Sequence, residues 1–143
     1  MSRFLQAEIN LKNLIHNFFI IRNRLKNKKA NCKIIAIVKA DAYGHGAVEV
    51  AHVLEKIGVD YLGVAFFEEA VVLRESGIKS PIIVLFDREV NGIFRYNLIP
   101  VIFDYKQAEI LSKEAFYHGV VLPIHIKIET GMGRLGIYEN ICD

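Results

Sequence analysis

The sequence predicts an α/β protein with a parallel sheet, in which strands and helices alternate along the chain. Short apolar runs of strand length recur through the 143 residues. Segments with apolar residues at helical spacing lie between these runs, and glycine or proline stands at several of the boundaries. Strands that alternate with helices in this way indicate βα units with right-handed crossovers.

The N-terminal part predicts a short strand followed by an amphipathic helix. Residues 4–9 form a brief, partly alternating apolar run. Asn10 is the predicted N-cap, because its side chain can accept hydrogen bonds from the free amide groups of the next turn. The helix that follows keeps its apolar residues on one face of a 3.6-residue period and ends in the polar stretch 27–31. These apolar residues are Leu11, Leu14, Ile15, Phe18, Ile21 and Leu25.

Four βα units and one further strand are predicted after this helix. The first strand, 34–38, is almost wholly apolar, as expected of a parallel strand that is covered on both faces. The other predicted strands are 61–65, 81–86, 99–103 and 123–129. The predicted helices are 47–57, which stops at Gly58, 68–76, which stops at Gly77, and then 87–96 and 104–117.

Two architectures fit this alternation: an open, doubly wound sheet and a (β/α) barrel. A closed barrel needs eight units and about 250 residues. The sequence holds about four and a half units, so these residues could form only an incomplete barrel.

The composition indicates a soluble, cytoplasmic protein with one sizeable core. The hydrophobic fraction is 52% and the formal net charge is +2, which gives no support for nucleic-acid binding. Cys32 and Cys142 form no metal-binding pattern, so they are interpreted as ordinary thiols, and no metal site is predicted. No apolar run approaches the roughly 18 to 20 residues that span a bilayer. The basic, amphipathic segment 14–24 could lie on a membrane surface, but a core-facing helix is the favoured interpretation.

A lysine stands at the carboxyl end of the first predicted strand, in the stretch Val-Lys-Ala-Asp-Ala-Tyr-Gly-His-Gly at 38–46. In parallel α/β proteins, ligands bind at this end of the sheet. Lys39 shares a strand face with Ile35 and Ile37, and a desolvated lysine amine can attack an aldehyde to form a Schiff base. A solvated surface charge is the commoner role for such a lysine. Our hypothesis is that Lys39 carries a cofactor.

The residues after Lys39 predict a turn. Asp41 is interpreted as a turn or capping residue. Gly44 and Gly46 would let the backbone approach a ligand closely. Tyr43 could donate to an anion or simply pack its ring.

A row of polar residues lies on the fifth predicted strand. His125, Lys127 and Glu129 face one way, and Ile124, Ile126 and Ile128 face the other. A barrel explains this pattern, because the isoleucines would meet outer helices and the polar groups would point into the interior. Arg134 follows in a glycine-rich turn, where its guanidinium could orient an oxyanion or a carboxylate.

The same turn contains Gly-Met-Gly-Arg-Leu-Gly at 131–136, which matches the dinucleotide-binding pattern G-x-G-x-x-G. That interpretation requires a helix that opens at the glycines and an acidic residue about 20 positions further on. Only seven residues follow Gly136 in this sequence, so neither requirement is met within it and the match is weak.

Two long stretches, in this order and at about this separation, resemble the N-terminal signatures of the bacterial alanine racemase family. They are Val-Lys-Ala-Asp-Ala-Tyr-Gly-His-Gly at 38–46 and Lys-Ile-Glu-Thr-Gly-Met-Gly-Arg-Leu-Gly at 127–136. Ala-Glu-Ile-Asn-Leu at 7–11 also resembles the start of that family. The resemblance implies a (β/α)₈ barrel followed by a C-terminal β-domain, in a head-to-tail homodimer. We expect residues 1–10 to be a strand segment that joins the β-domain, and 11–143 to be the N-terminal part of the barrel.

The resemblance also implies the site residues. Lys39 would form an aldimine with pyridoxal 5'-phosphate (PLP) and act as the base on the D-alanine side. Tyr43 matches a residue near the cofactor phosphate. Arg134 matches an arginine that contacts the phenolic oxygen side of PLP and places the substrate carboxylate. Lys127 matches a lysine that is carbamylated in several members and braces that arginine.

The implied activity interconverts L-alanine and D-alanine, which supplies D-alanine for the cell wall. Racemisation needs two bases on opposite faces, and the family's second base is a tyrosine of the partner's C-terminal domain. We therefore expect this chain to be an N-terminal part of the enzyme that is inactive alone and could be complemented by a C-terminal chain. A truncated gene, a split gene and an excised piece would each explain it. The alternatives are a PLP-binding, non-racemising relative of the same barrel type and a non-catalytic half-barrel that serves as an assembly module, for which exposed apolar surface predicts self-association.

Overall fold

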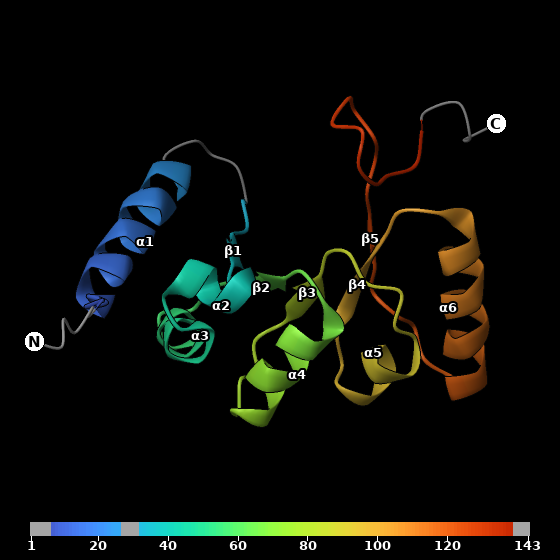
Figure 1. The fold of residues 1–143 in the computed structure, drawn as a ribbon, viewed down its shortest axis with the longest axis horizontal. Coiled ribbons are helices and arrows are strands. Elements are labelled where there is room, and N and C mark those ends of the chain that lie inside the picture. The colour runs from blue at the N-terminus through green and yellow to red at the C-terminus, as the bar shows by residue number, and fades with distance from the viewer. Residues whose placement is uncertain (1–6, 27–31, 139–143) are drawn as a thin grey trace, which may run out of the picture.

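The computed structural model describes residues 7–26 and 32–138 and shows one parallel sheet with the strand order β1-β2-β3-β4-β5 (Figure 1). Its strands are β1 (Ile35–Ile37), β2 (Tyr61–Val64), β3 (Ile82–Val84), β4 (Ile99–Ile102) and β5 (His125–Ile126). Its helices are α1 (Leu11–Lys26), α2 (Lys39–Gly44), α3 (Ala47–Lys56), α4 (Phe67–Glu75), α5 (Asn91–Arg95) and α6 (Tyr105–His118). No helix in the described ranges is long and apolar enough to cross a membrane.

The strand order identifies the architecture as a barrel type. Each strand pairs in parallel with the next strand in the sequence. A doubly wound sheet would instead reverse its direction of growth at a switch point. Helices α3 to α6 follow one another along the sheet (Figure 1). The prediction of an incomplete (β/α) barrel is confirmed.

The sheet is curved, as a barrel wall requires. Tyr61 on β2 and His125 on β5 lie edge to face, with ring centres 6.3 Å apart. A flat sheet would separate strands three positions apart by roughly 14 Å. Because the curvature shortens that path, side chains from distant strands meet on the inner face.

The predicted start of α1 is confirmed. The Asn10 side-chain oxygen accepts hydrogen bonds from the amides of Lys12 (3.0 Å) and Asn13 (3.2 Å). On the predicted apolar face, Phe18 is 6% exposed. Residues 7–9 of the predicted strand 4–9 form no strand in this structure, and residues 4–6 lie outside the described ranges. So do 27–31, the predicted end of this helix.

The helix predicted at 87–96 begins only at Asn91. The Asp87 carboxylate accepts from the amides of Arg88 (2.7 Å) and Glu89 (3.0 Å), and from that of Phe67 (2.7 Å). An aspartate that caps the amides just after it holds them in a turn. The helix therefore starts later than periodicity suggests.

The strand predicted at 123–129 is reduced to β5, which pairs with β4 on one side. Ile124, Ile126 and Ile128 remain exposed. The expectation that they meet outer helices is therefore not met by the part of the chain that the structure describes.

The buried core lies between the sheet and the helices. Leu62 and Val64 of β2, together with Ala70 and Leu73 of α4, are almost completely buried. The other sheet face is more open, and Ile35 and Ile37 of β1 are 41% and 40% exposed.

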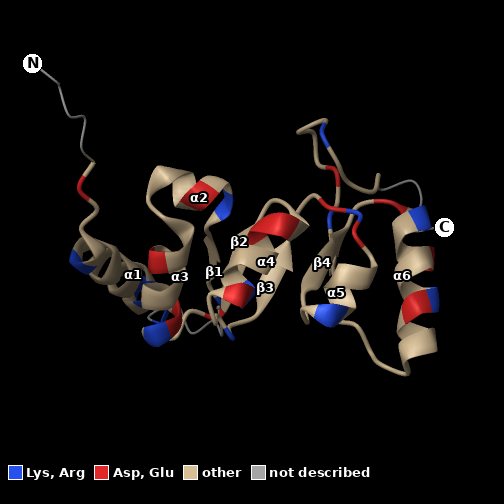
Figure 2. Ribbon diagram, turned by 60° about the horizontal axis from the view of Figure 1, so that its bottom comes forward, with Lys and Arg blue, Asp and Glu red and all other residues tan. Residues whose placement is uncertain are grey.

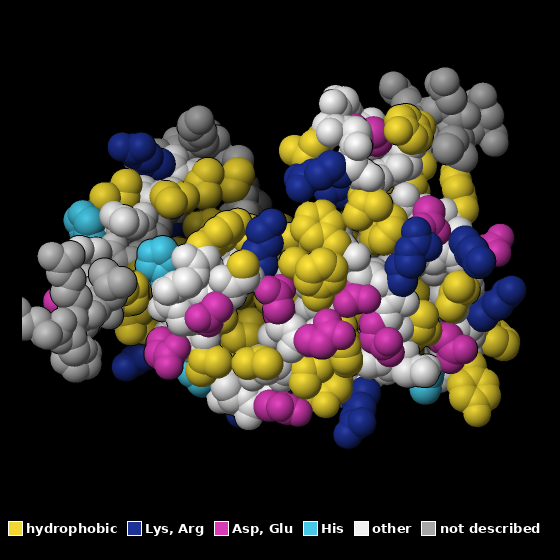
Figure 3. Space-filling view, viewed as in Figure 1, with side chains coloured by type: hydrophobic (Ala, Val, Ile, Leu, Met, Phe, Trp, Pro, Cys, Tyr) yellow, Lys and Arg dark blue, Asp and Glu magenta, His cyan; other side chains and the backbone are white. Residues whose placement is uncertain are grey.

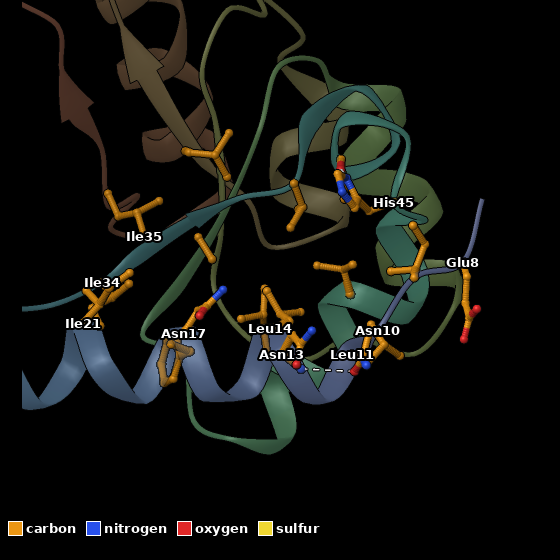
Figure 4. A pocket seen from close by; sticks show the side chains of 18 residues that line it. Glu8, Asn10, Leu11, Asn13, Leu14, Asn17, Ile21, Ile34, Ile35 and His45 are labelled. Atoms are coloured by element: carbon orange, nitrogen blue, oxygen red, sulfur yellow. Dashed lines mark hydrogen bonds between the residues drawn. The ribbon is translucent and has the colours of Figure 1, made fainter.

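An apolar groove of about 640 Å³ runs between α1 and β1 (Figure 4). Leu14 and Asn17 of α1 lie on one side of it, and Ile34 and Ile35 lie on the other. His45 lines its far end.

Candidate active site

The predicted cofactor lysine lies at the carboxyl end of β1, facing an aromatic ring. The Lys39 side chain is half-buried, and its Nζ lies 5.4 Å from the centre of the Phe86 ring. Phe86 follows β3, and its amide donates to the carbonyl of Ala65 after β2 (3.0 Å). A cation over a ring face is attracted by the ring quadrupole. Phe86 therefore provides an apolar surface beside the amine.

Two more cations reach the same ring. Lys127 Nζ lies 5.0 Å from its centre and the Arg134 guanidinium carbon lies 6.0 Å from it. We call Lys39, Lys127, Arg134 and Phe86 the Phe86 cluster. Figure 3 shows a hollow between α1 and the segment after β5, with hydrophobic and basic side chains along its floor. The structure thus brings together three of the four sequence-predicted site residues.

The cations of the Phe86 cluster have no acidic partner in the described ranges. The ion pairs there are Arg22–Asp60, Arg88–Asp104 and His118–Glu114. Like charges around one ring repel each other, and at the half-buried Lys39 and Lys127 water screens that repulsion only in part. The cluster is therefore a site that favours an anion.

Tyr43, the fourth predicted residue, is 62% exposed. It is not among the residues whose contacts define the Phe86 cluster. Phe86 was not predicted as a site residue. Its place at the end of the third predicted strand could have indicated it, because it lies at the same sheet edge as Lys39.

The segment after Lys39 is a left-handed helical turn, where a simple turn was predicted. Ala40, Asp41, Ala42 and Tyr43 have φ values of 51°, 53°, 51° and 56°. This conformation costs L-residues roughly 1–2 kcal/mol each, so local preference alone would not produce it. The packing of the buried Ala42 side chain (6% exposed) offsets part of this cost.

Side chains within the turn also stabilise it. Asp41 Oδ1 accepts from the Ala47 amide (2.6 Å) at the start of α3, which confirms the predicted capping role. His45 Nδ1 lies 2.8 Å from the Ala42 carbonyl oxygen. The backbone direction at Lys39 is thus set by a strained segment that is tied at both ends.

A carboxylate organises the loop that carries Arg134. Glu129 accepts hydrogen bonds from the amides of Gly131 (2.6 Å) and Arg134 (3.3 Å). Donation from the amides of Gly133 and Gly131 holds the pKa of Glu129 below its ordinary value. The Arg134 Nε and Nη2 point at Met132 Sδ, at 3.2 and 2.9 Å.

Chain packing requires the last glycine of this loop. A Cβ at Gly136 would lie 2.7 Å from the amide nitrogen of Glu129, so only glycine fits there. No helix opens at these glycines within the described residues, which end at 138. The dinucleotide-binding interpretation is therefore wrong.

Metal ligands do not gather in the described ranges, where no group of three or more His, Cys, Asp or Glu side chains could hold an ion.

Comparison with known proteins identifies the family. The family model "Alanine racemase, N-terminal domain" matches residues 9–141. The chain belongs to this family. It is 76% identical to an alanine racemase of Thermodesulfovibrio yellowstonii over 143 residues, which are 100% of this chain and 39% of that protein.

Solved structures agree with the alanine racemase fold. Alanine racemase from Clostridium difficile 630 has a TM-score of 0.80 and 37% identity, over 94% of this chain and 36% of that one. A structure of the same enzyme in complex with cycloserine has a TM-score of 0.80 and 38% identity, over 92% and 36% of the two chains. The chain thus spans well under half the length of these relatives.

The Phe86 cluster fits PLP, the cofactor that the alanine racemase family uses. The Arg134 guanidinium suits the phenolic oxygen of PLP, and the Lys39 amine is the group that would react with the PLP aldehyde. The half-buried Phe86 ring offers an apolar surface to an aromatic ligand.

Proposed function

We propose that this chain is the cofactor-bearing, N-terminal part of an enzyme that interconverts L-alanine and D-alanine with PLP. The observation that carries the proposal is the Phe86 cluster, in which three cations without an acidic partner in the described ranges surround one ring. The family membership supports the reaction class.

Each predicted residue has a proposed task. Lys39 binds the cofactor covalently through its amine and moves a proton at one face of the alanine Cα. Arg134 holds the alanine carboxylate and the phenolic oxygen of the cofactor, Lys127 supports Arg134, and Tyr43 binds near the phosphate. When bound, PLP supplies the electron sink that makes the Cα proton acidic.

The proposal extends to the assembly. We place the enzyme in the cytoplasm as a homodimer, with residues 1–10 joining a C-terminal β-domain and a partner tyrosine serving as the second base. The free Cys32 thiol is consistent with a reducing compartment.

Borohydride trapping tests the cofactor site. The purified chain is incubated with PLP, reduced and digested, and the labelled peptide is sequenced. We expect the label on Lys39 and its loss in Lys39→Ala. Lys33→Ala is a matched control, because Lys33 lies 5.4 Å from the Tyr61 ring much as Lys39 lies from Phe86. Label at another lysine, or none, would reject the assignment.

A second test concerns turnover. The three charged side chains of the Phe86 cluster are all cations, and racemisation needs a second base on the opposite face. We expect the 143 residues alone to leave L-alanine unchanged in a chiral assay. Measurable D-alanine formation by the chain on its own would contradict this.

A further inference from the structure

Within the described residues, one hydrogen bond joins the left-handed turn after Lys39 to a different βα unit. The hydrogen bonds of Asp41 and His45 stay inside the turn or reach the start of α3. The amide of Ala40 instead donates to Glu69 Oε1 of α4, at 2.6 Å and 29 residues away in sequence. This amide belongs to the peptide bond that follows Lys39.

The other carboxylate oxygen of Glu69 is anchored on its own side. Glu69 Oε2 accepts from the amides of Ala65 (2.7 Å) and Phe66 (3.1 Å), where β2 passes into α4. One half-buried carboxylate therefore joins two neighbouring units of the barrel wall. Figure 2 shows acidic residues at the start of α4 and a basic residue at the start of α2 at the same end of the sheet.

Both elements line the space beside Glu69. Glu69 and Asp41 line one cavity of about 200 Å³, together with Val38, Val64 and Leu73. The carboxylate thus lies between the turn and the β2–α4 junction, beside apolar side chains.

We propose that Glu69 is a positioning residue for Lys39. Its carboxylate holds the amide after Lys39 against the β2–α4 junction and so fixes the direction in which the lysine side chain leaves the backbone. The inference rests on the proposed function, in which Lys39 is the cofactor amine, and adds a residue that acts on the cofactor only through that lysine.

The chemistry of the three donors requires a carboxylate. All three partners of Glu69 are backbone N–H groups, and each needs an acceptor. In Glu69→Gln, one oxygen becomes an NH₂ group that cannot accept, so either Ala40 or the Ala65–Phe66 pair loses its partner. Because the α4 side holds two donors, we expect Gln to keep that side and release Ala40.

Amide hydrogen exchange in the protein without PLP tests the tie directly. We expect Glu69→Gln to speed exchange of the Ala40 amide about tenfold, while the β1 and α3 amides keep their rates. Glu68→Gln is the matched control, because it removes the same charge from an exposed side chain of the same helical turn. We expect it to change nothing. Unchanged exchange at Ala40 in Glu69→Gln, with faster exchange only along α4, would show a plain helix cap and overturn the proposal.

A second measurement needs no variant and so survives if Glu69→Gln fails to fold. In the wild type, an NMR coupling across the hydrogen bond should connect the Ala40 amide nitrogen with the Glu69 side-chain carboxyl carbon. Absence of this coupling, or a coupling to the Asp41 carboxyl carbon instead, overturns the proposed contact.

The effect on Lys39 is measured separately. We expect the apparent affinity for PLP, read from imine absorbance, to fall about tenfold in Glu69→Gln and to stay unchanged in Glu68→Gln. Exchange at Ala40 reports the tie without cofactor, and trapping at Lys39 reports the proposed function, so either can fail while the other stands. Faster Ala40 exchange with unchanged PLP affinity would reject the positioning role.

Discussion

The ammonium nitrogen of Lys39 lies 5.4 Å from the centre of the Phe86 ring. The lysine comes from the end of β1 and the phenylalanine from just beyond β3. β2 lies between these two strands. Where β2 passes into α4, Glu69 accepts a hydrogen bond from the Ala40 amide on the β1 side. On the β3 side, the Phe86 amide donates to the carbonyl of Ala65. The amine is therefore held near an apolar ring by two units of the curved sheet.

Replacement of the ring should weaken cofactor binding. In Phe86→Leu the apolar volume is largely kept, but the attraction between ring face and cations, about 0.5–2 kcal/mol per contact, is lost. We expect roughly tenfold weaker PLP binding, measured by imine absorbance. Phe116→Leu is the control, because Phe116 lies on α6 and is 90% exposed. Equal affinities in both variants would remove Phe86 from the site.

Relief of backbone strain should stabilise the chain. Ala40 is exposed and has a φ of 51°, which glycine adopts without steric cost. We expect Ala40→Gly to raise the free energy of unfolding by about 0.5–1 kcal/mol in urea titrations. Ala108→Gly in the right-handed α6 should lower it by about 1 kcal/mol. A change of the free energy of unfolding in the same direction in both variants would contradict the strain argument.

Acidification should loosen the loop that carries Arg134. Donation from the Gly133 and Gly131 amides depresses the pKa of Glu129 in the folded state. A depressed pKa means that the stabilisation is present above the ordinary glutamate range and is lost as the pH falls through the folded value. We expect the Gly131 amide to be protected from hydrogen exchange near neutral pH and to lose that protection in acid.

The matched variants for the loop are Glu129→Gln and Glu109→Gln. Glu129→Gln should lower the protection of the Gly131 amide from hydrogen exchange at every pH, so that acid causes no further loss. The second changes an exposed glutamate of α6 and should leave both unchanged. A Gly131 amide with the same protection at all pH values would show that the loop does not depend on the carboxylate.

The open face of β1 should promote association. Ile37 is 40% exposed beside the groove along α1. We expect the wild-type chain to self-associate with rising concentration in sedimentation velocity, and Ile37→Glu to reduce this. Ile110→Glu on α6, where the isoleucine is 41% exposed, is the control for added charge. A monodisperse monomer at all concentrations would refute this prediction.

The order and type of most elements could be read from the sequence. Apolar periodicity, the Asn10 cap and the glycines after the helices reflect local preferences that the fold keeps. Strand ends were less predictable, because pairing with neighbours decides where a strand stops. For β5, pairing on one side leaves only His125–Ile126.

The sequence by itself determined that Lys39 follows a strand, that Arg134 lies in a glycine-rich loop and that both belong to an alanine racemase pattern. Only the tertiary structure decided that these cations share the Phe86 ring, because the curvature of the sheet brings the ends of β1, β3 and β5 together. The left-handed turn also could not be predicted from the sequence. Alanine and aspartate favour a right-handed turn locally, and contacts such as the one from Glu69, distant in sequence, reverse that preference.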